Sequence, residues 1–263
     1  MRKIWIFLAL LTFAGLLIFT ACAKKGEQAS SEKEAKQATA ATPIDPSTVA
    51  SISGTIKFNG AVPKPVKIDT SQDPTCKTEV RTETAMVDNG NLQNVFVYVK
   101  DGLGGRTFET PKDPVTLDQH NCHYVPHVLG VMAGQTIKIL NSDPTTHNIH
   151  PTPKANREWN ESQPPKGAAL EKTFARPEIM LPVKCNQHPW MKMWININKS
   201  PFFAVTDKSG KFEIKGLPPG TYTIAAVHEK YGEQTQKVTV APKESKTADF
   251  TFKEGGAGSP SSQ

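Results

Sequence analysis

The sequence predicts an all-β protein built from β-sandwiches. Short runs rich in Val, Ile, Phe, Thr and Tyr recur along residues 51–253, and clusters of Gly, Pro, Asn and Asp separate them. Runs of this length with these boundaries are typical of strands and turns. No long amphipathic helical pattern competes with them. Together these observations favour sheets stacked around an apolar core.

Each expected strand is a short segment in which β-branched and aromatic residues gather, because such side chains suit a half-buried pleated surface. The expected strands cover residues 54–58, 95–99, 124–131, 136–140, 179–185, 193–198, 202–206, 211–214, 221–227, 236–240 and 247–252.

The first 22 of the 263 residues have the pattern of a secretory signal. Arg2 and Lys3 precede an apolar run over residues 4–19, and two further lysines follow soon after it. The run is short for a membrane span, which needs about 20 apolar residues. We therefore expect a segment that is cleaved after export.

Residues 19–22 (Phe-Thr-Ala-Cys) resemble the lipobox of bacterial lipoproteins, in which small residues precede a cysteine that is acylated. The resemblance implies that Cys22 is lipidated and becomes the mature N-terminus. An ordinary signal peptide with an incidental cysteine is the alternative. Ala23 directly after the cysteine resembles lipoproteins sent to the outer membrane. We therefore expect an exported protein, facing the periplasm or the cell surface and anchored to the membrane by its lipid.

Composition divides the remainder of the chain. Residues 23–50 are rich in Ala, Lys, Glu, Ser, Gln and Thr, so they are interpreted as a disordered tether, and residues 254–263 as a disordered tail. Between them we expect an N-terminal β segment over residues 51–112, a second β domain over 113–200 and a third over 201–253.

Charge excludes one class of partner. The formal net charge is +6, or +4 once Arg2 and Lys3 leave with the signal. No run of Lys and Arg is interleaved with aromatic residues, as a nucleic-acid surface would require. We expect no nucleic-acid binding.

The C-terminal part carries a motif series. Residues 207–210 (Asp-Lys-Ser-Gly) predict a hairpin turn, and residues 217–220 (Leu-Pro-Pro-Gly) lead into the strand that begins at Thr221. This series resembles the carboxypeptidase regulatory-like (transthyretin-like) domain, which implies a small β-sandwich without an active site. Residues 53–60 resemble the first strand and turn of the same domain. Either that sandwich is split along the chain, or residues 51–112 form a sheet of their own.

Four cysteines occur in a chain expected to reach an oxidising compartment. If Cys22 is lipidated, three remain, and one thiol is left over. Cys185 ends a strand and is followed at once by an imidazole and two thioethers. We therefore expect Cys76 and Cys122 to form a disulfide and Cys185 to stay a thiol.

The segment after Cys185 has the spacing of a copper-binding loop. Copper of the electron-transfer kind takes a thiolate, two imidazoles and a weak thioether. Cys185, His188 and either Met191 or Met193 supply three of these groups from one turn. The fourth group must come from elsewhere in the chain.

Upstream residues complete the pattern. An aromatic-x-Pro strand begins at Tyr124, a glycine turn lies at Gly134, an apolar strand ends at Asn141, and His147 and Asn148 follow in a loop. Together with the Cys-x2-His loop, this order resembles the plastocyanin and pseudoazurin family of cupredoxins. The resemblance spans about residues 113–198 and implies a cupredoxin-like Greek-key β-sandwich.

Carried over residue by residue, the resemblance implies that His147, Cys185 and His188 bind copper. The axial ligand is open between Met191 and Met193. Met193 keeps the plastocyanin-like spacing. Met191 is favoured because a loop shortened by proline should bring the nearer thioether over the metal.

These features predict an electron carrier with redox partners in the cell envelope rather than an enzyme. A copper enzyme would need further histidine clusters, which the sequence lacks. His228-Glu229 does not begin a zinc protease motif, because Gly232 stands in place of the second histidine. The alternatives are a copper-delivery or sensing protein and an adhesive β-sandwich lipoprotein without a redox role.

Overall fold

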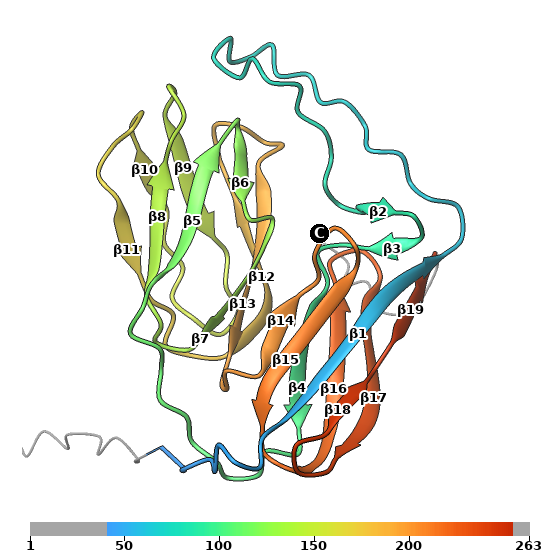
Figure 1. The fold of residues 1–263 in the computed structure, drawn as a ribbon. Helices are drawn as coiled ribbons and strands as arrows, with labels where there is room; N and C mark the ends of the chain where they lie inside the picture. The colour runs from blue at the N-terminus through green and yellow to red at the C-terminus, as the bar shows by residue number, and fades with distance from the viewer. Residues whose placement is uncertain (1–40, 255–263) are drawn as a thin grey trace, which may run out of the picture. The chain divides into compact units, whose positions relative to one another are not determined.

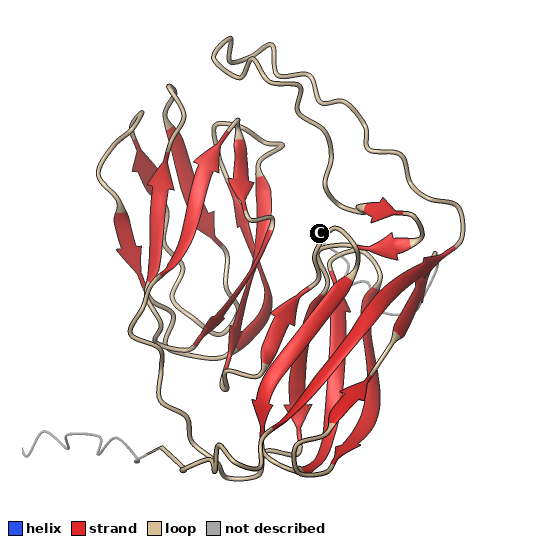
Figure 2. Cartoon of the chain, in the orientation of Figure 1, coloured by secondary structure: helices blue, strands red, loops and turns tan. Residues whose placement is uncertain are grey.

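The computed structural model describes residues 41–254, and every regular element within that range is a strand (Figure 2). The all-β prediction is confirmed. The signal peptide over residues 1–22, the lipidation of Cys22, most of the tether and nearly all of the tail lie outside the described residues. Within residues 41–254, no helix is long and apolar enough to cross a membrane.

Two pairs of sheets form two sandwiches, which we call sandwich A and sandwich B (Figure 1). One sheet of sandwich A contains β1 (Ala50–Asn59), β2 (Val87–Asp88), β3 (Asn91–Leu92), β15 (Lys211–Leu217), β18 (Ser245–Thr247) and β19 (Phe250–Lys253). Its other sheet contains β4 (Phe96–Asp101), β14 (Phe203–Val205), β16 (Gly220–His228) and β17 (Gly232–Val240).

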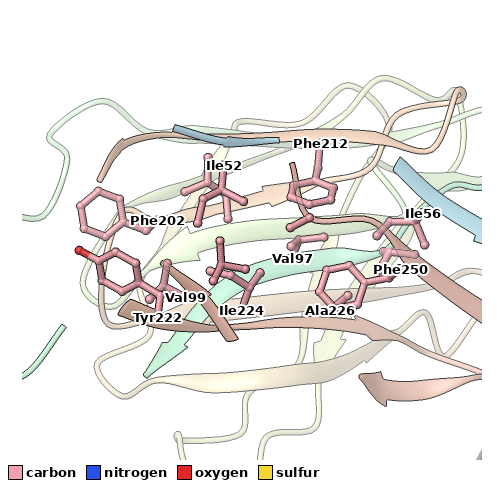
Figure 3. Packing of buried hydrophobic residues seen from close by; sticks show 14 of the residues in the cluster. Ile52, Ile56, Val97, Val99, Phe202, Phe212, Tyr222, Ile224, Ala226 and Phe250 are labelled. Carbon is pink, nitrogen blue, oxygen red and sulfur yellow. The ribbon is translucent and has the colours of Figure 1, made fainter. Parts of the chain in front are cut away.

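The core of sandwich A lies between these two sheets (Figure 3). Ile52 and Ile56 of β1 pack in one cluster with Val97 of β4 and Ile224 of β16, and all four are fully buried. Ile52 and Ile56 lie four positions apart and so point to the same face of β1, because successive side chains of a strand point to opposite faces. Full burial of one such side chain contributes about 1.5–3 kcal/mol.

Sandwich A takes strands from both ends of the described chain. β1 pairs antiparallel with β15 and parallel with β18 and β19, and β4 lies between β14 and β16. Residues 50–59 and 96–101 therefore belong to the same sheets as residues 203–253. Of the two arrangements left open above, the observed pairing is that of a split sandwich.

Sandwich B lies between β4 and β14 in the sequence. Its larger sheet contains β7 (Val128–Met132), β9 (His147–Pro151), β10 (Glu161–Gln163), β12 (Glu178–Lys184) and β13 (Lys192–Asn198). Its smaller sheet contains β5 (Val115–His120), β6 (His123–Val125), β8 (Ile137–Asn141) and β11 (Leu170–Lys172). Parallel pairs join β5 to β8 and β7 to β13, so neighbouring strands are not always consecutive in sequence.

Several strands of sandwich B differ from those expected. Residues 124–131 form two strands rather than one, because the chain leaves the ladder at Pro126, which has no N–H to donate, and at His127. β5, β9, β10 and β11 were not expected, since they contain many polar residues. In β9, only Ile149 is a large aliphatic residue, yet pairing with β10 and β12 makes the segment a strand. Tertiary pairing overrides local preference here.

The segment that joins β1 to β2, residues 60–86, has one isolated bridge, between Lys67 and Arg81, as its only regular pairing. A disulfide between Cys76 and Cys122 ties it to the turn between β5 and β6 of sandwich B. We call it the 60–86 segment. It brings residues from the start of the chain beside the site described next.

Candidate metal centre

Three side chains with metal-binding atoms meet at one end of sandwich B. His147 begins β9, Cys185 directly follows β12, and His188 lies in the turn between β12 and β13. β9 and β12 are antiparallel neighbours, with Lys184 opposite His150, so the first residue of β9 lies close to the end of β12. The ligand atoms of His147, Cys185 and His188 all lie within 4.8 Å of one another.

The atoms that converge can be identified. The Nδ1 atoms of His147 and His188 are 2.9 Å apart, and the Sγ atom of Cys185 lies 3.7 Å from Nδ1 of His188. The two imidazole rings are nearly perpendicular, with an interplanar angle of 68°. All three residues are buried, with exposed fractions of 0%, 2% and 4% for His147, Cys185 and His188. The thiol and both Nδ1 atoms therefore face a common, dry point.

Asn148 contacts the sulfur of Cys185 through two of its atoms. Its backbone N–H donates to Sγ of Cys185 over 3.5 Å, and its side-chain Oδ1 lies 3.3 Å from the same sulfur. That oxygen also accepts a hydrogen bond from the backbone N–H of Asn186 at 2.7 Å. Tyr124 donates its hydroxyl to the carbonyl of Asn148, and burial, followed by the nearby Cys185, raises the pKa of this tyrosine.

The loop from Cys185 to Met191 is closed by its own backbone. The N–H of Cys185 donates to the carbonyl of Met191 over 3.1 Å, and the N–H of Met191 donates to the carbonyl of His188 over 2.9 Å. Met191 is buried at the end of this turn. Met193 lies on β13, is also buried, and pairs with Val183 of β12. Both thioethers belong to the same apolar cluster as Cys185.

A carboxylate not singled out from the sequence binds the outer edge of His147. Nε2 of His147 donates to Oδ2 of Asp143 over 2.8 Å. Asp143 also accepts the backbone N–H groups of Asn121 and Cys122 at 2.7 and 2.8 Å. Burial is the largest influence on His147 and lowers the pKa of its imidazole, although the bond to Asp143 opposes it. A neutral imidazole is the form that can bind a metal.

A second carboxylate, Asp73 of the 60–86 segment, binds the outer edge of His188. Nε2 of His188 donates to Oδ2 of Asp73 over 3.0 Å, and Thr145 donates its hydroxyl to the same oxygen over 2.7 Å. Burial alone would raise the pKa of Asp73. The hydrogen bonds from Thr75, Thr145 and His188 outweigh it and hold the pKa well below its usual value.

The disulfide lies beside both carboxylates. The N–H of Cys76 donates to the carbonyl of Asp73, and the N–H of Cys122 donates to the carboxylate of Asp143. Trp190 donates its indole N–H to the carbonyl of Cys122 over 3.2 Å. Cys185 is a free, buried cysteine, which is the arrangement expected from the cysteine count.

The remaining histidines lie elsewhere. His150 contacts Asn186 and Glu158 on the outside of the loop. His127 pairs with Glu229 and not with a candidate ligand. Burial is the largest single influence on the pKa of His127 and lowers it, but Glu229, Glu83 and a backbone hydrogen bond together raise this pKa above its usual value. Among residues 41–254, the two other groups suited to a metal each include His147 or His188 together with a cysteine of the disulfide. All three groups of candidate metal ligands in the described residues thus lie at the same end of sandwich B.

The donor set fits copper. A thiolate and two imidazole nitrogens in a buried, preformed arrangement suit a soft or borderline ion, and a thioether nearby suits copper in particular. Zinc accepts the same thiolate and imidazoles, which makes it a useful redox-silent probe.

Sequence comparison identifies one domain of the chain. Residues 195–253 match the carboxypeptidase regulatory-like domain, which confirms that resemblance for the C-terminal part; the match starts within β13, ahead of the boundary expected at residue 201. A comparison with curated proteins gives no match.

Similar solved structures include three copper proteins. A Cu-containing nitrite reductase from Thermus scotoductus SA-01 is 22% identical, with 37% of this chain and 25% of that chain covered and a TM-score of 0.32. A mutant of amicyanin in its Cu(I) form is 18% identical, with 37% of this chain and 97% of that chain covered and a TM-score of 0.30. A purple cupredoxin from Nitrosopumilus maritimus is 19% identical, with 32% and 99% covered and a TM-score of 0.28. The chain thus spans a quarter of the length of the nitrite reductase.

Proposed function

We propose that this protein binds one copper ion through His147, Cys185 and His188, with Met191 as the axial ligand, and transfers electrons. The observation that carries the proposal is the convergence of one thiol and two Nδ1 atoms within 4.8 Å in a buried position. Copper bound there would supply one-electron redox chemistry, Cu(II)/Cu(I).

The protein's own residues would position the donors and exclude water. Strand β9, the end of β12 and the hydrogen-bonded turn that follows it hold the donors in place before any metal arrives, so little rearrangement would accompany a change of charge. Asn148 donates its backbone N–H to the sulfur and so helps to fix the position of the sulfur. Burial of all three donors excludes water from the metal position. A rigid, dry site of this kind suits an electron carrier.

His188 is the candidate ligand through which we expect electrons to pass to a redox partner. Its ring lies 5.1 Å from that of Trp190, which is only partly buried, and Pro189 between them is exposed. We propose that a redox partner docks at this edge of sandwich B.

Burial also bears on the main alternative. A copper-delivery or sensing protein must exchange its ion with another protein, which favours exposed ligands, whereas His147 has no exposed surface. An adhesive role would not require a preformed donor set. The preformed, buried donors therefore favour electron transfer over both.

The place of action is part of the proposal. We propose an exported lipoprotein that is anchored through Cys22, carries out no catalysis of its own and meets its redox partners in the cell envelope. The Cys76–Cys122 disulfide supports an oxidising compartment, because disulfides are rare where thiols are kept reduced.

Titration of the metal-free protein with Cu(II) tests the copper site. We expect an intense visible band from the thiolate and a reversible one-electron wave, both at one copper per chain. Cys185→Ser should abolish the band, and His147→Ala should shift it, while the exposed His120→Ala serves as the matched control. An unchanged band in Cys185→Ser would refute the site.

A further inference from the structure

The outer nitrogens of the two candidate histidine ligands share one arrangement. Nε2 of His147 lies 2.8 Å from Asp143, and Nε2 of His188 lies 3.0 Å from Asp73. A carboxylate only accepts hydrogen bonds, so each imidazole must carry a proton on Nε2. In the metal-free protein the two Nδ1 atoms lie 2.9 Å apart, the distance of a hydrogen bond from one to the other, and a metal that displaces that shared proton would find an Nδ1 lone pair on each ring. The two carboxylates thus select the tautomer that a metal requires.

Each carboxylate is itself held by other groups. Asp143 is 4% exposed and accepts two backbone N–H groups from the turn between β5 and β6. Asp73 accepts hydrogen bonds from Thr75 and from the hydroxyl of Thr145, which stands two residues before His147. Neither aspartate can turn away without breaking several hydrogen bonds, so both fix the angle of a ring as well as its tautomer.

The covalent connection explains how Asp73 reaches the site. Asp73 and His188 are 115 positions apart in sequence, and the 60–86 segment contributes no strand to sandwich B. Its covalent attachment there is the bond from Cys76 to Cys122, which adds to the packing of Val80 in the apolar cluster of sandwich B. Cys122 is also the residue whose N–H binds Asp143. The disulfide therefore positions one carboxylate covalently and shares a backbone contact with the other.

We infer that Asp73 and Asp143 are paired positioning residues for the metal ligands, and that the Cys76–Cys122 disulfide assembles the pair. The inference deepens the proposed function and rests on His147 and His188 being the ligands. A negative charge behind each imidazole makes Nδ1 a stronger donor and stabilises the more highly charged state of a bound ion. The pair should therefore strengthen Cu(II) binding more than Cu(I) binding.

The test compares Asp73→Asn and Asp143→Asn with the matched control Asp69→Asn. Asp69 lies in the same 60–86 segment, is exposed, and binds only its neighbour Ser71. In metal-free protein, nitrogen NMR of the imidazoles should show a fully protonated Nε2 on both histidines for wild type and Asp69→Asn, and only partial Nε2 protonation at His188 in Asp73→Asn and at His147 in Asp143→Asn. An Asn amide can donate or accept, so it no longer selects one tautomer.

Metal affinity gives a second readout. With Zn(II) as the probe, we expect Asp73→Asn to bind roughly 10–100-fold more weakly than Asp69→Asn, the usual effect of losing an outer carboxylate. Asp73→Glu should recover part of the loss. With copper, a tenfold greater loss for Cu(II) than for Cu(I) would raise the reduction potential by about 59 mV. Cys76→Ser/Cys122→Ser should reproduce the Asp73→Asn phenotype at His188.

The outcomes separate this inference from the proposed function. If tautomers and Zn(II) affinity in Asp73→Asn match those of Asp69→Asn, the positioning role is wrong, even if the copper band is intact. If wild type gives no thiolate band with copper but the Zn(II) contrast holds, the electron-transfer proposal fails and the positioning role stands. Because Asp73 lies outside the strands of sandwich B, its variant should fold even if Asp143→Asn does not.

Discussion

The backbone N–H of Asn148 points at the sulfur of Cys185 over 3.5 Å, although 37 positions separate the two residues in sequence. Asn148 directly follows one candidate ligand on β9, and Cys185 is another at the end of β12. The same Asn148 side chain binds the N–H of Asn186 beside the cysteine. One residue thus couples the two segments that carry the donors.

Asn148→Ala should loosen the copper site without emptying it. The variant keeps the backbone N–H to sulfur but loses the side-chain contacts to Cys185, Asn186 and Asn160. We expect a shifted visible band and a reduction potential that differs from wild type, with copper retained. Asn186→Ala is the control, because its side chain binds only His150 while its backbone N–H still reaches Asn148. Identical spectra for Asn148→Ala and wild type would contradict this role.

Met191→Leu and Met193→Leu should separate the two candidate axial ligands. Leucine removes the thioether and nearly conserves volume, so neither change should unfold the core. If Met191 is axial, its replacement raises the reduction potential and leaves copper bound, since the axial bond is weak and long. Met193→Leu should do little. Cyclic voltammetry of the two variants decides, and an effect confined to Met193→Leu would reverse the assignment.

Removing the disulfide should destabilise the fold. Cys76 and Cys122 are 46 positions apart. A closed loop of this length stabilises a fold by roughly 4 kcal/mol on the chain-entropy estimate. Cys76→Ser/Cys122→Ser should lower the free energy of unfolding by up to that amount, as urea denaturation would show.

In wild type, peptide mapping should find one disulfide and a titratable thiol at Cys185 after metal removal. A disulfide that includes Cys185 would contradict the copper site.

The stability of sandwich A should fall in mild acid because of His228. Burial is the main cause that lowers its pKa from 6.5 to about 4. The unfolded chain therefore takes up a proton in the window in which the folded protein does not. The free energy of unfolding is therefore highest, as far as His228 is concerned, above pH 6.5. It falls by about 3 kcal/mol in total as pH falls from 6.5 towards 4. Urea denaturation at a series of pH values measures the slope.

His228→Gln is the comparison for that slope, because glutamine does not titrate. The variant should lose overall stability, since His228 is buried and stacks on Tyr231. Its free energy of unfolding should nevertheless depend less on pH between 6.5 and 4 than that of wild type. Equal slopes in the two proteins would show that another group dominates.

Cys22→Ser should release the protein from membranes if the lipoprotein assignment holds. Once the signal is cleaved, acyl chains are the strong apolar attachment expected for this chain. Fractionation of cells that express wild type and Cys22→Ser measures the effect, and the buried Cys185→Ser variant controls for the loss of a cysteine as such. Undiminished membrane retention of Cys22→Ser would argue against a lipid anchor.

Local patterns were sufficient for much of the fold. Runs rich in β-branched and aromatic residues predicted most strands outside the polar segments, because such side chains suit a buried or half-buried pleated surface. The strands predicted in this way are β1, β4, β8, β12, β13, β14, β15, β16, β17 and β19. β9 escaped prediction, since its histidines, asparagine and proline do not resemble a strand until β12 pairs with it. His147 was therefore expected in a loop, whereas it begins a strand whose neighbour carries Cys185 on to the same point.

The sequence by itself determined that the protein is all-β and that its C-terminal part resembles a carboxypeptidase regulatory-like domain, predicted over residues 201–253 and matched over residues 195–253. It also determined that Cys185 and His188 lie three positions apart in one turn. Spacing within a loop fixes such proximity directly, because a short chain cannot separate its own residues far. Only the tertiary structure decided that Asp73 and Asp143 bind the outer nitrogens of the histidines. An aspartate that orients a ligand and one on the surface look alike in sequence, and contact across 115 positions arises from folding and a disulfide.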